Sequence, residues 1–227
     1  DITGTLGYIS TLITSSYLAI RLSGEELEIR SIIVILFVLI WALRLGLFLF
    51  IRIIKAGEDA RFNEVKKVPS QFLIWWSISA LWVFLTSANA LTMIINNKNL
   101  LNDTYLYLGV SIWLVGFLFE VIADEQKRRF NSNPKNKGEF ITSGLWSISR
   151  HPNYFGEIIL WYGIAIITLP TLEGWQYLTL ISPIFVSLLL IKVSGINLLE
   201  QRAESKWGKL DSYKAYKKET SVLIPFI

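Results

Sequence analysis

The segment 144–157 carries a dense set of hydrogen-bond donors, of types that suit a charged ligand. It holds the only histidine, His151, directly after Arg150. An arginine guanidinium can bind a phosphate or a carboxylate through two parallel hydrogen bonds. Pro152 favours a helix start, because its φ angle is already helical. A lone histidine is usually structural, but in this company we predict that the segment contacts a ligand. Its other candidates are Asn153, Tyr154 and Glu157.

A second group of charges lies where the apolar stretch 104–123 ends. Glu120 and Asp124 are four residues apart, which places both on one face of a helix. Lys127 and Arg128 follow and could bind phosphate oxygens. The alternative is that these cations only anchor the helix at the membrane surface.

Three further candidates lie elsewhere in the chain. Arg44 falls inside the apolar stretch 31–54, where a charge costs about 2.5–3.5 kcal/mol and therefore indicates a site or an ion pair between helices. Glu200 and Tyr213 belong to the tail 194–227, where they could fold back beneath a helix bundle. The alternative for this tail is an amphipathic helix lying on the membrane.

The composition excludes several kinds of chemistry. The chain has no cysteine and one histidine, which excludes disulfides, cysteine nucleophiles and sites of several histidines. It contains none of the glycine-rich nucleotide-binding motifs and no nucleophile elbow. The net charge of +4 is better explained by basic membrane loops than by nucleic-acid binding, so we expect no nucleic-acid partner.

The elements that must position these residues are membrane helices. Of the 227 residues, 52% are hydrophobic and only 18% are charged, against about 25% in soluble domains. A spanning helix needs about 20 mostly apolar residues. We therefore predict an all-α polytopic bundle forming one transmembrane domain over 1–227. The six predicted spans are 5–22, which is weak, 31–54, 71–95, 104–123, 155–170, and 175–193, which Pro183 interrupts.

The basic residues predict the orientation of the bundle. Segments 55–70, 124–154 and 194–227 hold four, six and six of the 22 lysines and arginines, whereas the alternate loops hold only three. Because basic loops stay in the cytoplasm, these three segments are predicted to be two cytoplasmic loops and a cytoplasmic C-terminal tail.

Four blocks of the chain resemble the DUF1295 membrane-protein family, relatives of the steroid 5-alpha-reductases and, more remotely, of the isoprenylcysteine carboxyl methyltransferases. The third block is the most specific. Asp1 is similar to the aspartate that follows the first helix of the family, so we expect a further N-terminal span. The blocks are 41–45 with 57–62, 120–130, 149–157, and 194–200 with Tyr213, Tyr216, Ile224 and Pro225.

The resemblance implies a cavity open to the cytoplasm that holds NADPH, and a lipid-like enone that enters from the bilayer. Trp41 stands where the steroid reductases carry a tyrosine that polarises the substrate carbonyl, and Glu120 replaces their asparagine, so cofactor binding carries over better than steroid specificity. The positions that the resemblance and the residue types assign to the cofactor are Arg44, Lys55, Glu120, Asp124, Lys127, Arg128, Arg150, His151, Asn153, Tyr154, Glu157, Glu200 and Tyr213.

Three functions remain open at this stage. The first is an NADPH-dependent reductase of a C=C bond in a hydrophobic sterol-like or isoprenoid substrate, with the hydride chemistry supplied by the cofactor. The second is an S-adenosylmethionine-dependent methyltransferase, which has less need for phosphate-binding cations near Asp124. The third is a membrane protein that binds lipid without turnover. No catalytic residue is assigned.

Overall fold

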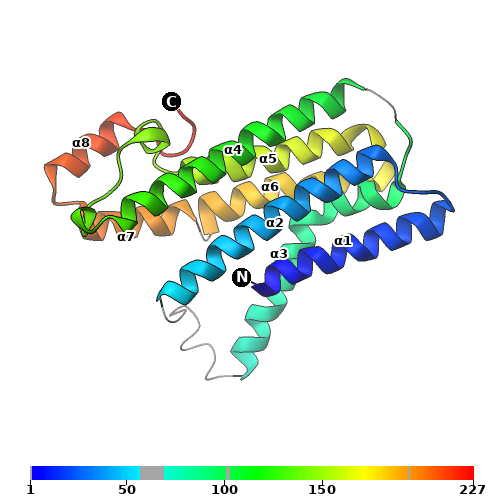
Figure 1. Ribbon diagram of the computed structural model, residues 1–227, viewed down its shortest axis with the longest axis horizontal. Helices are drawn as coiled ribbons and strands as arrows, with labels where there is room; N and C mark the ends of the chain where they lie inside the picture. Colours follow the sequence, from blue (N-terminus) through cyan, green and yellow to red (C-terminus); the bar gives the residue numbers. More distant parts are fainter. Residues whose placement is uncertain (1, 57–68, 101–102, 194) are drawn as a thin grey trace. The chain divides into compact units, whose positions relative to one another are not determined.

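The computed structural model describes residues 2–56, 69–100, 103–193 and 195–227, and this part of the chain is helical without any strand. Figure 1 shows the helices in chain order. The α-helices are α1 (Ile2–Ser23), α2 (Ile29–Ala56), α3 (Pro69–Asn96), α4 (Thr104–Ser132), α5 (Pro152–Thr168), α6 (Ile181–Leu188), α7 (Ile196–Trp207) and α8 (Asp211–Glu219). Shorter turns are η3 (Pro134–Asn136), η4 (Gly144–Ser147), η5 (Leu169–Thr171), η6 (Gly174–Leu180) and the π-helical η7 (Leu189–Val193).

Helical membrane architecture is confirmed, with differences at the ends of the helices. Among the described residues, five helical stretches are long and apolar enough to span a membrane: Ile29–Ile51, Trp76–Asn96, Thr104–Ser132, Pro152–Thr171 and Gly174–Trp207. The weak candidate 5–22 forms the helix α1 but is not among these five. Pro183 lies in the first turn of α6, where a proline is tolerated, so it does not break that helix. The block 57–62 and Ser194 lie outside the described residues.

The contacts within the chain group into two compact units, and the single transmembrane domain over 1–227 stays a prediction. Unit 1 comprises Asp1–Leu106 and Ile167–Ser182, and unit 2 comprises Tyr107–Ile166 and Pro183–Ile227. Each unit is described by itself below.

Unit 1 packs α1, α2 and α3 around a small buried core. Its aromatic centre is Tyr8 of α1, whose ring meets Trp41 of α2 edge to face at 5.2 Å between centroids. Other apolar side chains on the same helices are exposed, such as Leu47 and Leu81. Apolar side chains that face outward on long helices are expected where lipid replaces water.

The buried arginine Arg30, at the start of α2, organises a polar cluster in unit 1. Its Nη1 donates to the carbonyl of Ile167 at 2.7 Å, and its Nη2 lies 2.5 Å from the carboxylate of Asp103. Beside it, the side chain of Asn97 accepts from the hydroxyl of Ser31 and from the backbone N–H of Glu28. In folded proteins nearly every buried polar group has a hydrogen-bond partner, and these contacts supply partners to the polar groups of this cluster.

In unit 2, glycines let α4 and α5 approach each other backbone to backbone. A β-carbon on Gly156 would lie 2.5 Å from the backbone nitrogen of Glu120 and 2.5 Å from the carbonyl oxygen of Gly116. Gly163, seven residues further along α5, meets the backbone of Trp113 in the same way. Small residues at such spacings are typical of closely packed membrane helices. The contact fixes the start of α5, and with it the segment that precedes it.

Candidate functional site

A buried ion-pair cluster joins the start of α5 to α7 within unit 2. The carboxylate of Glu200 lies between two partners: Arg150 Nη2 donates to Oε2 at 2.9 Å, and His151 Nε2 lies 2.9 Å from Oε1. The side chains of Arg150 and His151 are 9% and 7% exposed, while that of Glu200 is 23% exposed. Since both carboxylate oxygens are engaged, Glu200 fixes the positions of the arginine and the histidine together.

The C-terminal tail holds the backbone of 148–151 in place. Arg150 donates its backbone N–H to the carbonyl of Ser221 at 2.9 Å, and the hydroxyl of Ser149 donates to the carbonyl of Leu223 at 2.7 Å. The guanidinium of Arg150 also donates to the carbonyls of Lys217 and Thr220. The tail therefore positions Arg150 through both its backbone and its side chain.

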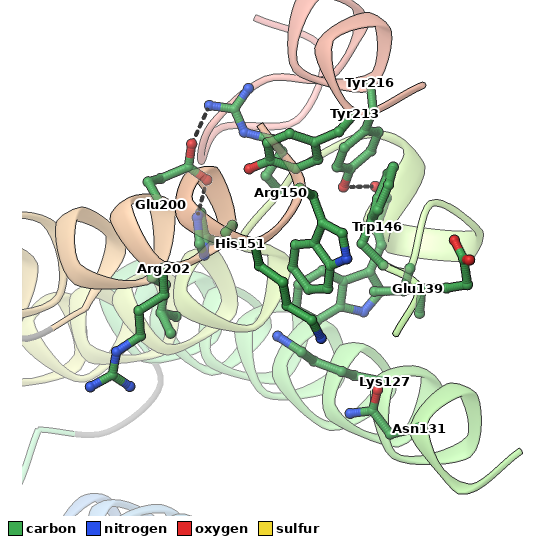
Figure 2. A pocket seen from close by; sticks show the side chains of 16 residues that line it. Lys127, Asn131, Glu139, Trp146, Arg150, His151, Glu200, Arg202, Tyr213 and Tyr216 are labelled. Carbon is green, nitrogen blue, oxygen red and sulfur yellow. Dashed lines mark hydrogen bonds and ion pairs between the residues drawn. The ribbon is translucent and has the colours of Figure 1, made fainter. Parts of the chain in front are cut away.

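A cavity of about 260 Å³ opens beside this cluster, entirely within unit 2. Figure 2 shows Arg150, His151 and Glu200 on one side of it and Tyr213, Tyr216 and Trp146 on another. Five residues of α7 that line the cavity lie on one face of that helix. Counted from the first of them, the others follow at three, four, seven and eight positions, the spacing of a single helix face. These residues are Leu199, Arg202, Ala203, Lys206 and Trp207.

Hydrogen bonds fix the aromatic walls of the cavity. Trp146 Nε1 donates to the carbonyl of Ala123 at 3.0 Å, and Tyr216 Oη donates to the carbonyl of Trp146 at 2.6 Å. Trp207 Nε1 donates to the carbonyl of Gly138 at 2.6 Å. Burial raises the pKa of Tyr213 and of Tyr216, so both phenols stay protonated at neutral pH.

A positive φ angle shapes the turn that presents Trp146. Gly144 has φ +65°, and a β-carbon there would lie within 2.6 Å of the side-chain amide of Gln126. The same amide oxygen accepts the N–H of Leu145 at 2.9 Å. Glycine allows both the conformation and the close approach, so that the turn η4 can place Trp146 against α4.

Two lysines lie over indole rings on the lining of the cavity. Lys127 Nζ of α4 is 4.3 Å from the centroid of Trp146, and Lys206 Nζ of α7 is 4.4 Å from the centroid of Trp207. Attraction between an ammonium and the face of an indole holds each lysine near its ring. The cavity therefore combines flat apolar walls with cations from two different helices.

The structure brings five of the predicted cofactor residues together on this cavity. They are Lys127, Arg150, His151, Glu200 and Tyr213. Tyr154 does not line it, but its ring stacks on His151 at 5.8 Å between centroids.

The remaining predicted residues lie outside the cavity lining. Asn153 Nδ2 donates to Asp124 Oδ1 at 3.2 Å. Glu120 and Glu157 are buried in unit 2. Arg128 is on the surface, paired with Glu125. Arg44 belongs to unit 1, where its guanidinium lies 5.8 Å from the ring of Phe48, and the side chain of Lys55 lies outside the described part of the structure.

Several lining residues were missed by the sequence analysis. Trp207 and Lys206 fall in a tail that the sequence describes equally well as an interfacial helix, and Tyr216 appeared only as part of a resemblance. The signal that could have found them is the helical spacing from Leu199 to Trp207, which places them on one face. No group of residues that could hold a metal ion occurs in the part of the chain that the structure describes.

Comparisons with known proteins agree with the resemblance drawn from the sequence. The model of the family described as "Protein of unknown function (DUF1295)" matches residues 1–220. The chain is 25% identical over 129 residues to 3-oxo-5-alpha-steroid 4-dehydrogenase 1 of Bos taurus, covering 56% of this chain and 44% of that protein. It is 29% identical over 90 residues to Delta(14)-sterol reductase of Arabidopsis thaliana, covering 35% and 24%.

A methyltransferase matches a shorter stretch at higher identity. The probable O-methyltransferase ustE of Ustilaginoidea virens is 39% identical over 66 residues, which cover 29% of this chain and 23% of that protein. The matched part thus spans less than half the length of each of these three relatives. No solved structure matched the chain.

Proposed function

The chain belongs to the DUF1295 family, and we propose that it is a membrane reductase that uses NADPH to reduce a C=C bond in a hydrophobic, lipid-like substrate. The observation that carries the proposal is the cavity of unit 2, in which fixed aromatic walls and cationic side chains lie together. The relatives whose printed names are reductases or steroid dehydrogenases support the reaction class.

The residues on the cavity suit a nicotinamide dinucleotide. Aromatic walls can pack against a flat ring, and lysine or arginine side chains can bind its phosphates. Arg150 lines the cavity, where an arginine side chain can bind a phosphate of the nucleotide.

Each of these residues would have its own part in such a site. NADPH, when bound, would supply the hydride. Glu200 would hold Arg150 and His151 in fixed positions, and the protonated phenols of Tyr213 and Tyr216 would offer hydrogen-bond donors without adding negative charge. The tail 220–227 would hold the backbone of Arg150 in place.

The membrane helices would deliver the substrate. Long helices with exposed apolar side chains suit a protein surrounded by lipid, from which a hydrophobic substrate can enter. The basic segments 124–154 and 194–227 contribute residues to the cavity, and basic segments stay in the cytoplasm. We therefore place the cavity and the C-terminus on the cytoplasmic side.

The test uses the full chain purified in detergent. Binding of NADPH, NADH and S-adenosylmethionine is measured by calorimetry, and consumption of NADPH is followed with an unsaturated steroid and an unsaturated sterol as substrates. We expect NADPH to bind and to be oxidised with at least one substrate class. Arg150→Ala should abolish binding, while Arg129→Ala, an exposed cation on α4 that does not line the cavity, should leave it unchanged.

A second candidate function is transfer of a methyl group from S-adenosylmethionine. It is favoured by the identity of 39% to a probable O-methyltransferase over 66 residues. Binding of S-adenosylmethionine without any response to NADPH would replace the reductase by this function. Binding of a lipid with no consumption of either cofactor would indicate a protein without turnover.

A further inference from the structure

The segment 222–227, which follows α8 in unit 2, carries a group of exposed apolar side chains. Phe226 and Ile227 are 85% and 86% exposed, and Val222 and Ile224 are exposed as well. Contiguous apolar side chains on a surface mark a place that meets a protein, a ligand or a membrane. The question is which of these partners the position of the segment favours.

Hydrogen bonds tie the backbone of this segment to the turn before α5. The N–H of Phe226 donates to the carbonyl of Ile148 at 3.4 Å, and the hydroxyl of Ser221 donates to the same carbonyl at 2.8 Å. Ile148 lies four residues before Pro152, where α5 begins. The exposed apolar side chains are therefore held beside the start of a helix that is long and apolar enough to span a membrane.

The start of α5 lies level with the point where α4 changes from apolar to charged. Asn153 in the first turn of α5 donates to Asp124 of α4 at 3.2 Å. Before Asp124, α4 exposes the apolar side chains of Leu118 and Ile122, whereas five of the six residues 124–129 are charged. Because α4 and α5 are both candidate spans, this level marks the boundary between lipid and water in unit 2.

We propose that the segment 222–227 lies in the interfacial region of the bilayer, with Phe226 and Ile227 in contact with lipid beside the start of α5. The aromatic side chains of α8, Tyr213 and Tyr216, line the cavity instead, so the apolar contact with lipid comes from the segment that follows this helix. Lys218, which is exposed just before the segment, suits the phosphates of anionic headgroups. The partner is the membrane itself, so this proposal does not depend on the cofactor or the reaction.

The experiment measures how deep the segment lies in a bilayer. The chain contains no cysteine, so one introduced cysteine gives a single site for a polarity-sensitive fluorophore. The full chain carrying Ile227→Cys is labelled and reconstituted into vesicles of phosphatidylcholine and phosphatidylglycerol. Quenching by lipids that carry a nitroxide near the headgroup or near the end of the acyl chain gives the depth of the label, which we expect at about 5–10 Å below the headgroup boundary.

A second labelling site serves as the matched control. Asp211→Cys places the same fluorophore at the start of α8, in the same unit, where the native side chain is 96% exposed. We expect this label to emit as in water and to be quenched by neither nitroxide lipid. The difference between the two labels then reports the position of the segment and not an affinity of the fluorophore for lipid.

Variants of Phe226 test whether its side chain holds the segment at the bilayer. Phe226 has φ +67°, a left-handed conformation that asparagine adopts more readily than most residues. Phe226→Asn therefore removes the apolar ring without opposing the backbone, and Phe226→Leu keeps an apolar side chain. We expect the label at position 227 to lose most of its quenching by lipid nitroxides in the asparagine variant and to keep it in the leucine variant.

Three outcomes would overturn the proposal. The label at position 227 could emit as in water, with no quenching by lipid nitroxides, in the otherwise unmodified chain. Equal quenching in the asparagine and leucine variants would show that the apolar side chain does not hold the segment in the bilayer. A label that is shielded from water, escapes the lipid nitroxides and responds to the ratio of protein to lipid would show that a second copy of the chain covers the segment.

Discussion

Arg30 in unit 1 and Arg150 in unit 2 are both buried arginines paired with a carboxylate, yet their surroundings differ. Arg30 donates to the carbonyls of Ile167 and Leu100 and to Asp103, and it does not line the cavity. Arg150 shares Glu200 with His151 and lines a cavity with aromatic walls. A buried ion pair is therefore not by itself a sign of a site. What distinguishes Arg150 is the cavity beside it and the further cations that line that cavity.

The difference also concerns how each arginine is positioned. Arg30 is held by the carboxylate of Asp103 and by two carbonyls from segments of unit 1 that are far apart in the chain. Arg150 is held by a C-terminal tail, through the carbonyls of Lys217, Thr220 and Ser221. The contacts of Arg30 join separate segments of unit 1, whereas the contacts of Arg150 hold its guanidinium beside the cavity of unit 2. The comparison predicts that Arg30 matters for stability and Arg150 for binding.

The largest effect is expected from Arg30→Met. Asp103 would lose its buried partner, and breaking a buried ion pair from one side costs about 3–5 kcal/mol of unfolding free energy. Replacing both partners, as Arg30→Met with Asp103→Asn, should cost less, because no lone charge remains and the asparagine oxygen can still accept the backbone N–H of Leu106, which Asp103 accepts at 2.8 Å. The measurement is denaturant-induced unfolding of the detergent-solubilised chain, followed by circular dichroism.

Two outcomes would contradict the comparison between Arg30 and Arg150. If the single variant is no less stable than the double variant, Arg30 does not have the structural role assigned to it. If the folded single variant loses its affinity for nucleotide, Arg30 contributes to binding, and the separation between the two arginines disappears.

Much of the fold follows from the sequence, because long apolar stretches bounded by charged loops leave little choice of structure. The helices α2 to α5 lie where the composition predicts them, and α4 continues to Ser132, past the predicted end of its apolar span at 123. Its charged last turns carry Lys127 to the cavity. Hydropathy locates spans and does not mark where a helix ends in water.

The site was predictable only in part. The pairing of Arg150 and His151 with Glu200 joins residues about 50 positions apart, and only the resemblance had grouped these blocks. Arg30 was counted among loop charges, since nothing in one sequence tells that Asp103, 73 positions away, is its partner. Long-range pairs of this kind depend on packing, which a single sequence does not reveal.

An intermediate effect is expected where the two units differ in helix packing. Gly156→Ala places a methyl group 2.5 Å from backbone atoms of α4, so the helices must separate, at a cost of about 1–3 kcal/mol. In unit 1, Gly4 of α1 has open space around the same position, and Gly4→Ala should be neutral or stabilise the helix by up to about 1 kcal/mol. Thermal unfolding of the two variants side by side measures the contrast.

The outcome bears on the cavity as well as on stability. Because α5 follows directly after His151, a shift of α5 away from α4 should also move His151. The Gly156→Ala variant should therefore bind nucleotide more weakly than the unmodified chain. Equal stability of the two alanine variants would contradict the close backbone contact between α4 and α5.

The smallest effects are expected from exposed ion pairs, of which we compare one from each unit. Lys98 pairs with Glu173 in unit 1 and Lys217 pairs with Glu204 in unit 2, and the partners are between 31% and 75% exposed. Exposed pairs contribute less than about 1 kcal/mol because water and salt screen them. Lys98→Ala and Lys217→Ala should therefore both unfold close to the unmodified chain, and raising the salt concentration should remove what difference remains. Lys98 lies in the same unit as Arg30, so a loss from Lys98→Ala as large as that from Arg30→Met would show that ion pairing itself, and not burial, sets the stability of unit 1.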